Sequence, residues 1–446
     1  MTRLGDVCEK IGSGATPRGG KEAYKDAGIP IIRSQNIHDW VFQPDGLAFL
    51  DDEQAESLSN VEVRSNDVLL NITGDSVARA CIVPSERIPA RVNQHVAIVR
   101  AGKEINPTYL LASLQSKKTT LLSLASSGAT RNALTKRMIE NLDIDLPSRE
   151  IQDSIAQVLD SIQYKRTLNN RLNDYLSQIC DAEFTDFVSN QRDASWHDGT
   201  LNELVEIRYG KDHKKLAEGP YPVYGSGGFM RSVEKPLSSG ESVLIPRKGS
   251  LNNVMYVDEK FWTVDTMFFT IPLKPGAAKY VYQYTKRLDF GTMNSGSAVP
   301  SMTTKILNSL VIPIPSDSAL VSFNKKLQPF FDLFGKNEEE NRRLVSLRDI
   351  LLPKLMSGEI DVSKVDLTQL TNNHLAGRMH WSNVIRVRAI HAVHSQQSQI
   401  PAYESVPKVS HSPCRTALTL GGIAPLLSWL AVSQFTAQSF AMLVVF

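Results

Sequence analysis

Apolar residues recur at three- and four-residue steps over a long segment near the middle of the chain. This segment, residues 149–188, contains neither glycine nor proline, and its steps are interrupted once, near Lys165. The spacing predicts an amphipathic helix about 60 Å long, since a helix rises about 1.5 Å per residue. The positions that form the predicted apolar stripe are Ile151, Ile155, Val158, Ile162, Leu168, Leu172, Leu176 and Ile179.

A second segment with the same periodicity begins near Asp317 and extends to about Ile360. Proline and glycine interrupt it at Pro329, Gly335 and Pro353, so we expect this helix to kink or fray there. Its apolar positions are Leu320, Phe323, Leu327, Phe330, Phe331, Phe334, Leu344, Leu347, Leu351 and Leu355.

These two predicted helices offer each other a partner. A single amphipathic helix of forty residues leaves an apolar stripe in water, which is unfavourable unless another surface covers it. The pattern therefore predicts an antiparallel coiled coil. The alternative is that each helix packs only on its own domain.

The segments that precede the helices, residues 1–125 and about 195–293, are predicted to form short strands broken by turns. The first contains "GIPIIRSQNI", "NDVLLNITGDSVARACIVP" and "VNQHVAIVRA". The second contains "PYPVYGSGGF", "ESVLIPRKGSLNNVMYVDE" and "FWTVDTMFFTI". "VLLNITG" (Val68–Gly74) and "VLIPRKG" (Val243–Gly249) both begin Val-Leu and reach glycine at the seventh position, so the two segments share a weak common plan.

A clearer repeat lies directly before each helix. "SSGATRNALTKRMIENLDIDLPS" (Ser126–Ser148) and "NSGSAVPSMTTKILNSLVIPIPS" (Asn294–Ser316) align without a gap, and we call both copies the junction segment. They share Ser127/Ser295, Gly128/Gly296, Thr135/Thr303, Leu142/Leu310, Ile144/Ile312, Pro147/Pro315 and Ser148/Ser316. The chain is therefore predicted to be an internal duplication.

Together these patterns predict an α+β fold with two globular mixed α/β domains, two long helices and a pseudo-twofold internal repeat. The expected parts are a first domain at 1–148, a spacer helix at 149–192, a second domain at 193–316 and a C-terminal helix at 317–366. Residues 367–446 form an atypical tail that includes the charge-free run Thr416–Phe446. Because that run contains several polar residues, we expect neither membrane insertion nor a part in the functional fold.

Composition adds two limits. The net charge of +2 leaves no global polycation, so a nucleic-acid site has to be a local basic patch. Four cysteines without CxxC spacing and a polar N-terminus favour a reducing, cytoplasmic location without a zinc site.

Sequence motifs for catalysis are absent. "GSGATPRGGK" fails as a phosphate-binding loop, because Ala15 and Glu22 stand where glycine and Ser or Thr are needed. The chain contains no HExxH, no GxSxG and no NPPY or DPPY stretch. We expect no active site, cofactor or metal in this chain.

Polar and basic side chains gather instead in loops of both domains. Asn and Gln bond adenine, Arg bonds guanine, and hydroxyl groups and glycine amides suit phosphates. The alternative is that Asn, Ser and Gly only form turns. The candidate DNA-binding residues are Arg33, Ser34, Gln35, Asn36, Thr73, Gly74, Arg79, Asn93, Gln94, His95, Arg131, Lys136, Ser226, Arg247, Lys248, Asn252 and Asn253.

The order of these parts resembles the specificity subunit of type I restriction–modification systems. The resemblance covers roughly residues 1–366 and rests on "LGDVCEKIGSGATPRGG", "IPIIRSQNI", "VLLNITG" and "NQHVAIVR". It also rests on the first junction segment followed by "REIQDSIAQVLDSI", and on the ending "LLPKLMSGEI". The tail resembles nothing in that family.

This resemblance implies that each domain reads one half of a bipartite site in double-stranded DNA. It implies that the helices set the spacing and dock two modification (methyltransferase) subunits, which restriction (nuclease/translocase) subunits join. S-adenosylmethionine, ATP and Mg would then sit on those partners. Two alternatives remain: a coiled-coil scaffold that binds no DNA, and an enzyme whose motifs are no longer readable.

Overall fold

The computed structural model describes residues 1–126, 132–293 and 301–362 of the chain. They divide into two compact units, one comprising Met1–Asn169 with the chain from Asn341 onward, and one comprising Asn170–Glu340. Two long helices, α6 (Arg149–Asn190) and α9 (Asp317–Met356), each contribute a stretch to both units. The predicted tail at 367–446 and parts of both junction segments lie outside the described residues.

The first unit contains two four-stranded sheets, with strand orders β6-β3-β10-β7 and β2-β11-β8-β9. A short ribbon, β1-β12, joins its start to the junction segment, and β4-β5 forms a small hairpin. The strands are β1 (Thr2–Arg3), β2 (Cys8–Ser13), β3 (Ile29–Ile32), β4 (Ile37–His38), β5 (Val41–Phe42), β6 (Ala48–Leu50), β7 (Glu62–Val63), β8 (Val68–Asn71), β9 (Ala80–Ile82), β10 (Ala90–Val92), β11 (Val96–Ala101) and β12 (Asp143–Ile144). The helices are α1 (Leu4–Val7), α2 (Asp52–Ser57), α3 (Pro107–Ser116), α4 (Lys118–Ser126) and α5 (Lys136–Glu140).

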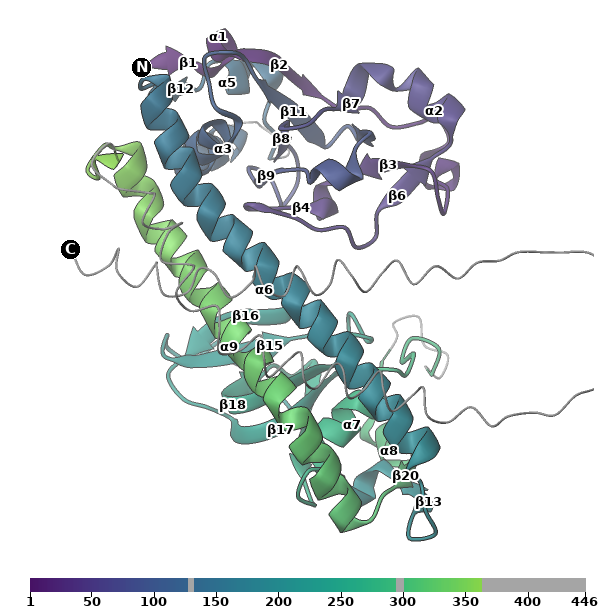
Figure 1. Ribbon diagram of the computed structural model, residues 1–446. Helices are drawn as coiled ribbons and strands as arrows, with labels where there is room; N and C mark the ends of the chain where they lie inside the picture. The colour runs from purple at the N-terminus through teal and green to yellow at the C-terminus, as the bar shows by residue number, and fades with distance from the viewer. Residues whose placement is uncertain (127–131, 294–300, 363–446) are drawn as a thin grey trace, which may run out of the picture. The chain divides into compact units, whose positions relative to one another are not determined.

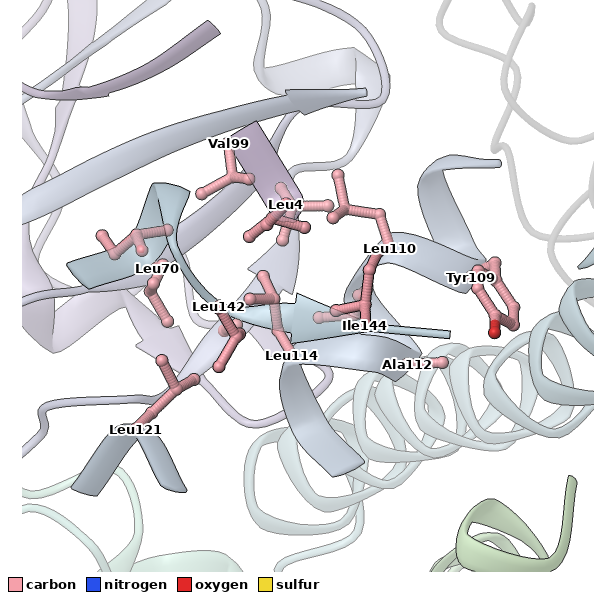
Figure 2. Packing of buried hydrophobic residues seen from close by; sticks show 14 of the residues in the cluster. Leu4, Leu70, Val99, Tyr109, Leu110, Ala112, Leu114, Leu121, Leu142 and Ile144 are labelled. Carbon is pink, nitrogen blue, oxygen red and sulfur yellow. The ribbon is translucent and has the colours of Figure 1, made fainter. Parts of the chain in front are cut away.

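Helices α3 and α4 cover the second of these sheets. Figure 2 shows Leu70 of β8, Val99 of β11, and Leu110 and Leu114 of α3 within one hydrophobic cluster that also contains Leu4. The same cluster includes residues from the beginning of α6 and the end of α9: Ile155, Val158, Leu159, Leu352 and Leu355. Both long helices are therefore anchored in the core of the first domain.

The second unit is built on one six-stranded sheet of order β14-β19-β17-β18-β15-β16, with a separate ribbon β13-β20. Its core joins the sheet to α7, to the later part of α6 through Phe184 and Phe187, and to the beginning of α9 through Phe323. Phe187 and Phe323 stack with ring centroids 4.4 Å apart. The elements are β13 (His197–Thr200), β14 (Val205–Tyr209), β15 (Tyr221–Gly225), β16 (Gly228–Val233), β17 (Ser238–Pro246), β18 (Met255–Thr263), β19 (Met267–Pro272), α7 (Ala277–Thr285), α8 (Thr304–Asn308) and β20 (Val311–Ile314).

Both units repeat one plan, which confirms the predicted internal duplication. The order β2-β11-β8-β9 recurs as β14-β19-β17-β18, with every neighbouring pair antiparallel in both. The junction segments also match: Thr135 caps α5 and Thr303 caps α8, each accepting a hydrogen bond of 3.3 Å from a backbone N–H. The predicted strands in both globular segments are present as well.

Both predicted long helices are present, with two corrections. Ile151 and Ile179 are exposed rather than on the buried stripe, because the adjacent Gln152 and Cys180 take the inward positions. Helix α9 is assigned as one uninterrupted helix across Pro329, against the expectation of a kink or fraying. Pro329 lies on the exposed side, where water can satisfy the carbonyl that proline leaves without a donor.

Within each unit a stretch of α6 runs beside a stretch of α9 (Figure 1). In the first unit Asn169 donates to Asn341 over 3.1 Å. In the second, Asn337 donates to Asn173 over 2.7 Å, and Asn173 donates to Glu338 over 3.0 Å. Later residues of α6 meet earlier residues of α9, so the helices run antiparallel. In the middle of the helix pair, buried asparagines alternate with the buried side chains of Leu168, Leu176 and Leu344.

The buried amide pair predicts an asymmetry between single and double substitutions. Asn337→Leu leaves the side chain of Asn173 without its donor in a buried place, so we expect a loss of about 1–3 kcal/mol in unfolding free energy. Adding Asn173→Leu removes both polar partners, and we expect the stability to return to that of the unmodified chain or above.

Urea unfolding of the full chain measures both variants. Gln178→Leu, an exposed change on α6, is the control and should alter stability by no more than about 0.5 kcal/mol. A double variant less stable than the single one would contradict the buried pair.

Candidate nucleic-acid interface

Strand register assigns several candidate residues of the first domain a counterpart in the second. Thr73 bridges Ala133 of the first junction segment, and Lys248 bridges Ser301 of the second. Three further correspondences follow from the strands that hold these residues: Ser34 with Ser226, Arg79 with Asn253, and His95 with Thr266. The candidate residues thus gather at one equivalent place in each domain.

In the first domain this place is an open pocket. It lies where β3 ends and where the β8–β9 and β10–β11 connections approach each other. Six of its eight lining residues are among those predicted from sequence. The lining is Ser34, Gln35, Thr73, Gly74, Asp75, Ser76, Arg79 and His95.

The pocket combines fixed and free polar groups. His95 Nδ1 and Thr73 Oγ1 are 2.7 Å apart, so each orients the other. The guanidinium of Arg79 has no hydrogen bond or ion pair within the part of the chain that the structure describes. Gly74 has a φ of +76° and its counterpart Gly249 a φ of +85°, a backbone region that favours glycine. The matching glycines seen in the sequence are therefore required by equivalent turns.

Two predicted residues of the first domain shape the pocket without lining it. Asn36 is fully buried and donates to the carbonyls of Gln43 and Asp45 over 2.9 and 3.1 Å, while its side chain accepts from the N–H of Arg33. Asn93 is also buried, and its side chain accepts from the N–H of His95 over 3.1 Å. Both asparagines make loop hydrogen bonds of the kind that the turn-forming alternative expects.

Arg33 and Gln35 are tied to the same loop. Both donate to the carbonyl of Gly46, and the Arg33 guanidinium lies 5.5 Å from the ring of Tyr24. Gln94 makes a side-chain hydrogen bond with Thr16 at the start of the neighbouring loop. These contacts fix the rim of the pocket.

In the second domain the equivalent place is more basic. Lys248 is exposed, and the guanidinium of Arg247 lies 5.7 Å from the ring of Tyr209. Asn253 donates to the carbonyl of Ser226 over 2.8 Å, which ties the β15–β16 turn to the β17–β18 loop. Asn252 is exposed, and its side-chain amide donates to the carboxylate of Asp289 over 3.0 Å.

Two further candidates belong to the first junction segment. Lys136, at the start of α5, is exposed and forms an ion pair of 3.4 Å with Glu140. Arg131 lies outside the described residues. Thr266 escaped the sequence analysis, because a single threonine before a strand has no distinguishing pattern. Only its register match with His95 identifies it.

The family of the chain follows from its sequence as a whole. The model of the type I restriction modification DNA specificity domain matches residues 1–178 and again residues 194–345, and the chain belongs to this family. The two matches coincide with the two repeats described above. The chain is thus a specificity subunit of a type I restriction–modification system with two target-recognition domains, as the sequence resemblance implied.

Several curated proteins are similar to this chain. The MjaX and MjaIX type I restriction enzyme specificity subunits of Methanocaldococcus jannaschii are 21% and 22% identical over 411 and 421 residues, covering 81% and 82% of this chain and 93% and 94% of theirs. The HindI specificity subunit of Haemophilus influenzae is 32% identical over 134 residues, which is 30% of this chain and 25% of that protein. A solved type I S subunit from M. genitalium matches with a TM-score of 0.48 at 16% identity, covering 79% of this chain and 95% of that one.

Within residues 1–126, 132–293 and 301–362, no cluster of three or more His, Cys, Asp or Glu side chains is arranged to hold a metal ion. No helix in these ranges has the length and apolar character needed to cross a membrane.

The buried Asn36 predicts a stability effect that its exposed neighbour lacks. Asn36→Ala leaves buried backbone groups of its loop without partners, so we expect a loss of about 1–3 kcal/mol in unfolding free energy. Gln35→Ala, at an exposed position with one hydrogen bond, should cost no more than about 0.5 kcal/mol. Urea unfolding of the two variants is the measurement, and equal losses would contradict the positioning role of Asn36.

Proposed function

We propose that each target-recognition domain reads one half of a bipartite DNA site through the place defined by Ser34 and Arg79 in the first domain, and by Ser226 and Lys248 in the second. The observation that carries this proposal is their structural equivalence: the same strands and turns present these positions in both domains. Equivalent positions with different side chains are what two related readers of different sequences need.

The chemistry of the two places suits DNA in different ways. In the first domain Arg79 offers guanine a bidentate donor, and Asp75 offers cytosine an acceptor. In the second, Lys248 and Arg247 supply positive charge for phosphates or guanine, beside the amide of Asn252. The exposed loop ends, rather than the buried amides, are the groups that reach base edges.

The helices are proposed to form the predicted antiparallel coiled coil and to set the distance between the half-sites. This role is supported by the antiparallel contacts within each unit. It is also supported by the fact that each helix continues without a break from one unit into the other. The polar pairs at Asn169 and Asn173 fix one register, since a shift along the helix would leave these buried amides unpaired.

The chain is proposed to act as the non-catalytic part of a larger complex in the cytoplasm. Two methyltransferase subunits would dock on the helices, and restriction subunits would join them. S-adenosylmethionine, ATP and Mg would be bound by those partners. A coiled-coil scaffold without DNA affinity is the rival, and salt-dependent DNA binding by the assembled complex separates the two.

Single substitutions in the equivalent β8–β9 and β17–β18 connections test whether each domain reads its own half-site. In the assembled methyltransferase complex, Arg79→Gln should relax the sequence requirement in one half-site by about 1–3 kcal/mol of discrimination. Lys248→Gln should affect only the other half, so each variant is the control for the other. Sequencing of methylated DNA in cells that carry each variant gives both half-sites. A change in both halves from one variant would show that the domains are not independent readers.

Matched insertions test the helices as a spacer. One heptad placed between Asn169 and Asn173 in α6, and one between Asn337 and Asn341 in α9, keeps the antiparallel register. It lengthens the pair by about 10 Å, or up to about three base pairs of duplex. The unread spacer should grow by about one to three base pairs while both half-sites stay the same.

The α6 heptad alone is the control, and it should weaken assembly because the polar pairs no longer meet. Sequencing of methylated DNA reads the spacer directly. An active double-insertion complex with an unchanged spacer would show that helix length does not set the distance between the half-sites.

A further inference from the structure

Two large apolar side chains stand in solvent beside the candidate site of the second domain. Phe229 and Met230 are each 55% exposed, although they belong to strand β16. β16 is the last strand of the six-stranded sheet, and Phe229 pairs with Tyr224 of β15. The turn Ser226–Gly227 that joins the two strands is part of the candidate site. We call Phe229 and Met230 the apolar pair.

The rigidity of this hairpin comes from its own contacts. The ring of Phe229 lies 6.5 Å from that of Tyr224, nearly perpendicular to it. A Cβ on Gly225 would come within 2.6 Å of the Met230 sulfur, so the methionine side chain packs closely over this glycine. Asn253 donates a hydrogen bond to the carbonyl of Ser226 and so holds the turn in place. The apolar pair is therefore presented on a braced support.

Positive charge borders the apolar pair on two sides. On one side, Asn253 ties the turn to the loop that carries Arg247 and Lys248. On the other, Arg231 of the same strand donates to the carbonyl of Leu216 and so holds the preceding loop, in which Lys211, Lys214 and Lys215 are exposed.

Two acids, Asp212 and Glu218, lie in that loop. Asp212 accepts a hydrogen bond from the backbone N–H of Lys214, which lowers the pKa of its carboxyl, so it remains ionised and offsets one lysine. The three lysines still leave this loop positive. Apolar side chains beside exposed cations are complementary to a ligand that has a negatively charged backbone and flat apolar groups.

Duplex DNA fits this description when one base step is opened. Phe and Met are among the side chains that proteins insert between stacked bases, while neighbouring cations hold the phosphates. A flat protein partner would require a continuous apolar surface, whereas here two apolar side chains lie beside a lysine-rich loop and a tyrosine whose hydroxyl donates to Glu259.

We propose that the second domain inserts Phe229 at a base step of its half-site and unstacks it. This proposal rests on the proposed DNA-reading function and names a residue through which the second domain acts.

The first domain lacks this device. Its strand equivalent to β15 is β3, and the chain then enters a long folded loop, Arg33–Leu47, before it returns in β6. Where the second domain has a two-residue turn and the apolar pair, the first domain has a polar pocket rim. Unstacking is therefore expected in one half-site and not in the other.

The test uses the complex of this chain with its methyltransferase subunits and duplexes carrying the methylated site. 2-Aminopurine is placed in turn at each position of both half-sites. Its fluorescence should rise several-fold at one step in the half read by the second domain. The methylated base itself is left out, because methyltransferases extrude their target.

The variant Phe229→Ser/Met230→Ser should abolish that rise and weaken DNA binding by about tenfold to a hundredfold, as loss of a stacking contact does. Phe229→Leu, which keeps an apolar wedge, should retain part of the rise. Leu273→Ser is the matched control, because Leu273 is also 55% exposed but lies beyond the far end of β19, about 20 Å along the strand from Thr266.

Each outcome decides one question. If the unmodified complex binds the site but the serine variant keeps both affinity and fluorescence, the insertion is wrong while the proposed function stands. Loss of complex assembly in the serine variant would assign the apolar pair to a protein partner and overturn the proposal. If the unmodified complex shows no site-specific binding, the proposed function itself fails.

Discussion

The need of two forty-residue amphipathic helices to bury their apolar faces determines how this chain is built. Neither helix buries its face against one surface. The beginning of α6 and the end of α9 enter the core of the first domain, and the opposite ends enter the core of the second. Each helix is thus part of two cores, and the stretch between them is where burial is least apolar. That is where the asparagine pairs lie, so register is specified at the point where apolar packing specifies it least.

The same division explains how the two sites are supported. Sheets that pack on helices present their other ends as loops, and loops carry the polar side chains that a rigid core cannot hold. Because both domains use one strand order, both present the same turns, and the residues on those turns differ freely. Arg79 and Asn253 occupy one position, yet the first is free within the described residues and the second is engaged with Ser226. The two domains share a strand order, and the side chains on their equivalent loops differ.

Sequence reasoning succeeded where periodicity or repetition carried the signal. The helices, the duplication and most of the pocket lining were predicted because their patterns extend over many residues. It failed where one side chain decides the outcome. An asparagine in a loop has the same sequence signature whether it is exposed, as Asn252 is, or buried, as Asn36 is. Ile151 fits a three- and four-residue stripe, but Gln152 takes the buried position and bonds to the backbone N–H of Asn106. Thr266 has no signature of its own.

The junction segments are held in a way that bears on how such chains evolve. In the first domain the hydroxyl of Tyr109 donates to the carbonyl of Asp145, and in the second that of Tyr280 donates to the carbonyl of Pro313. These two acceptors are matched positions of the repeat, and both are backbone atoms. Every residue has a backbone carbonyl, so this hydrogen bond does not depend on the side chains of the junction segment. If recombination replaces a domain with another that carries the same tyrosine, the hydrogen bond to the junction segment forms at once. New specificities can therefore arise by crossing over, without a compensating mutation at this contact.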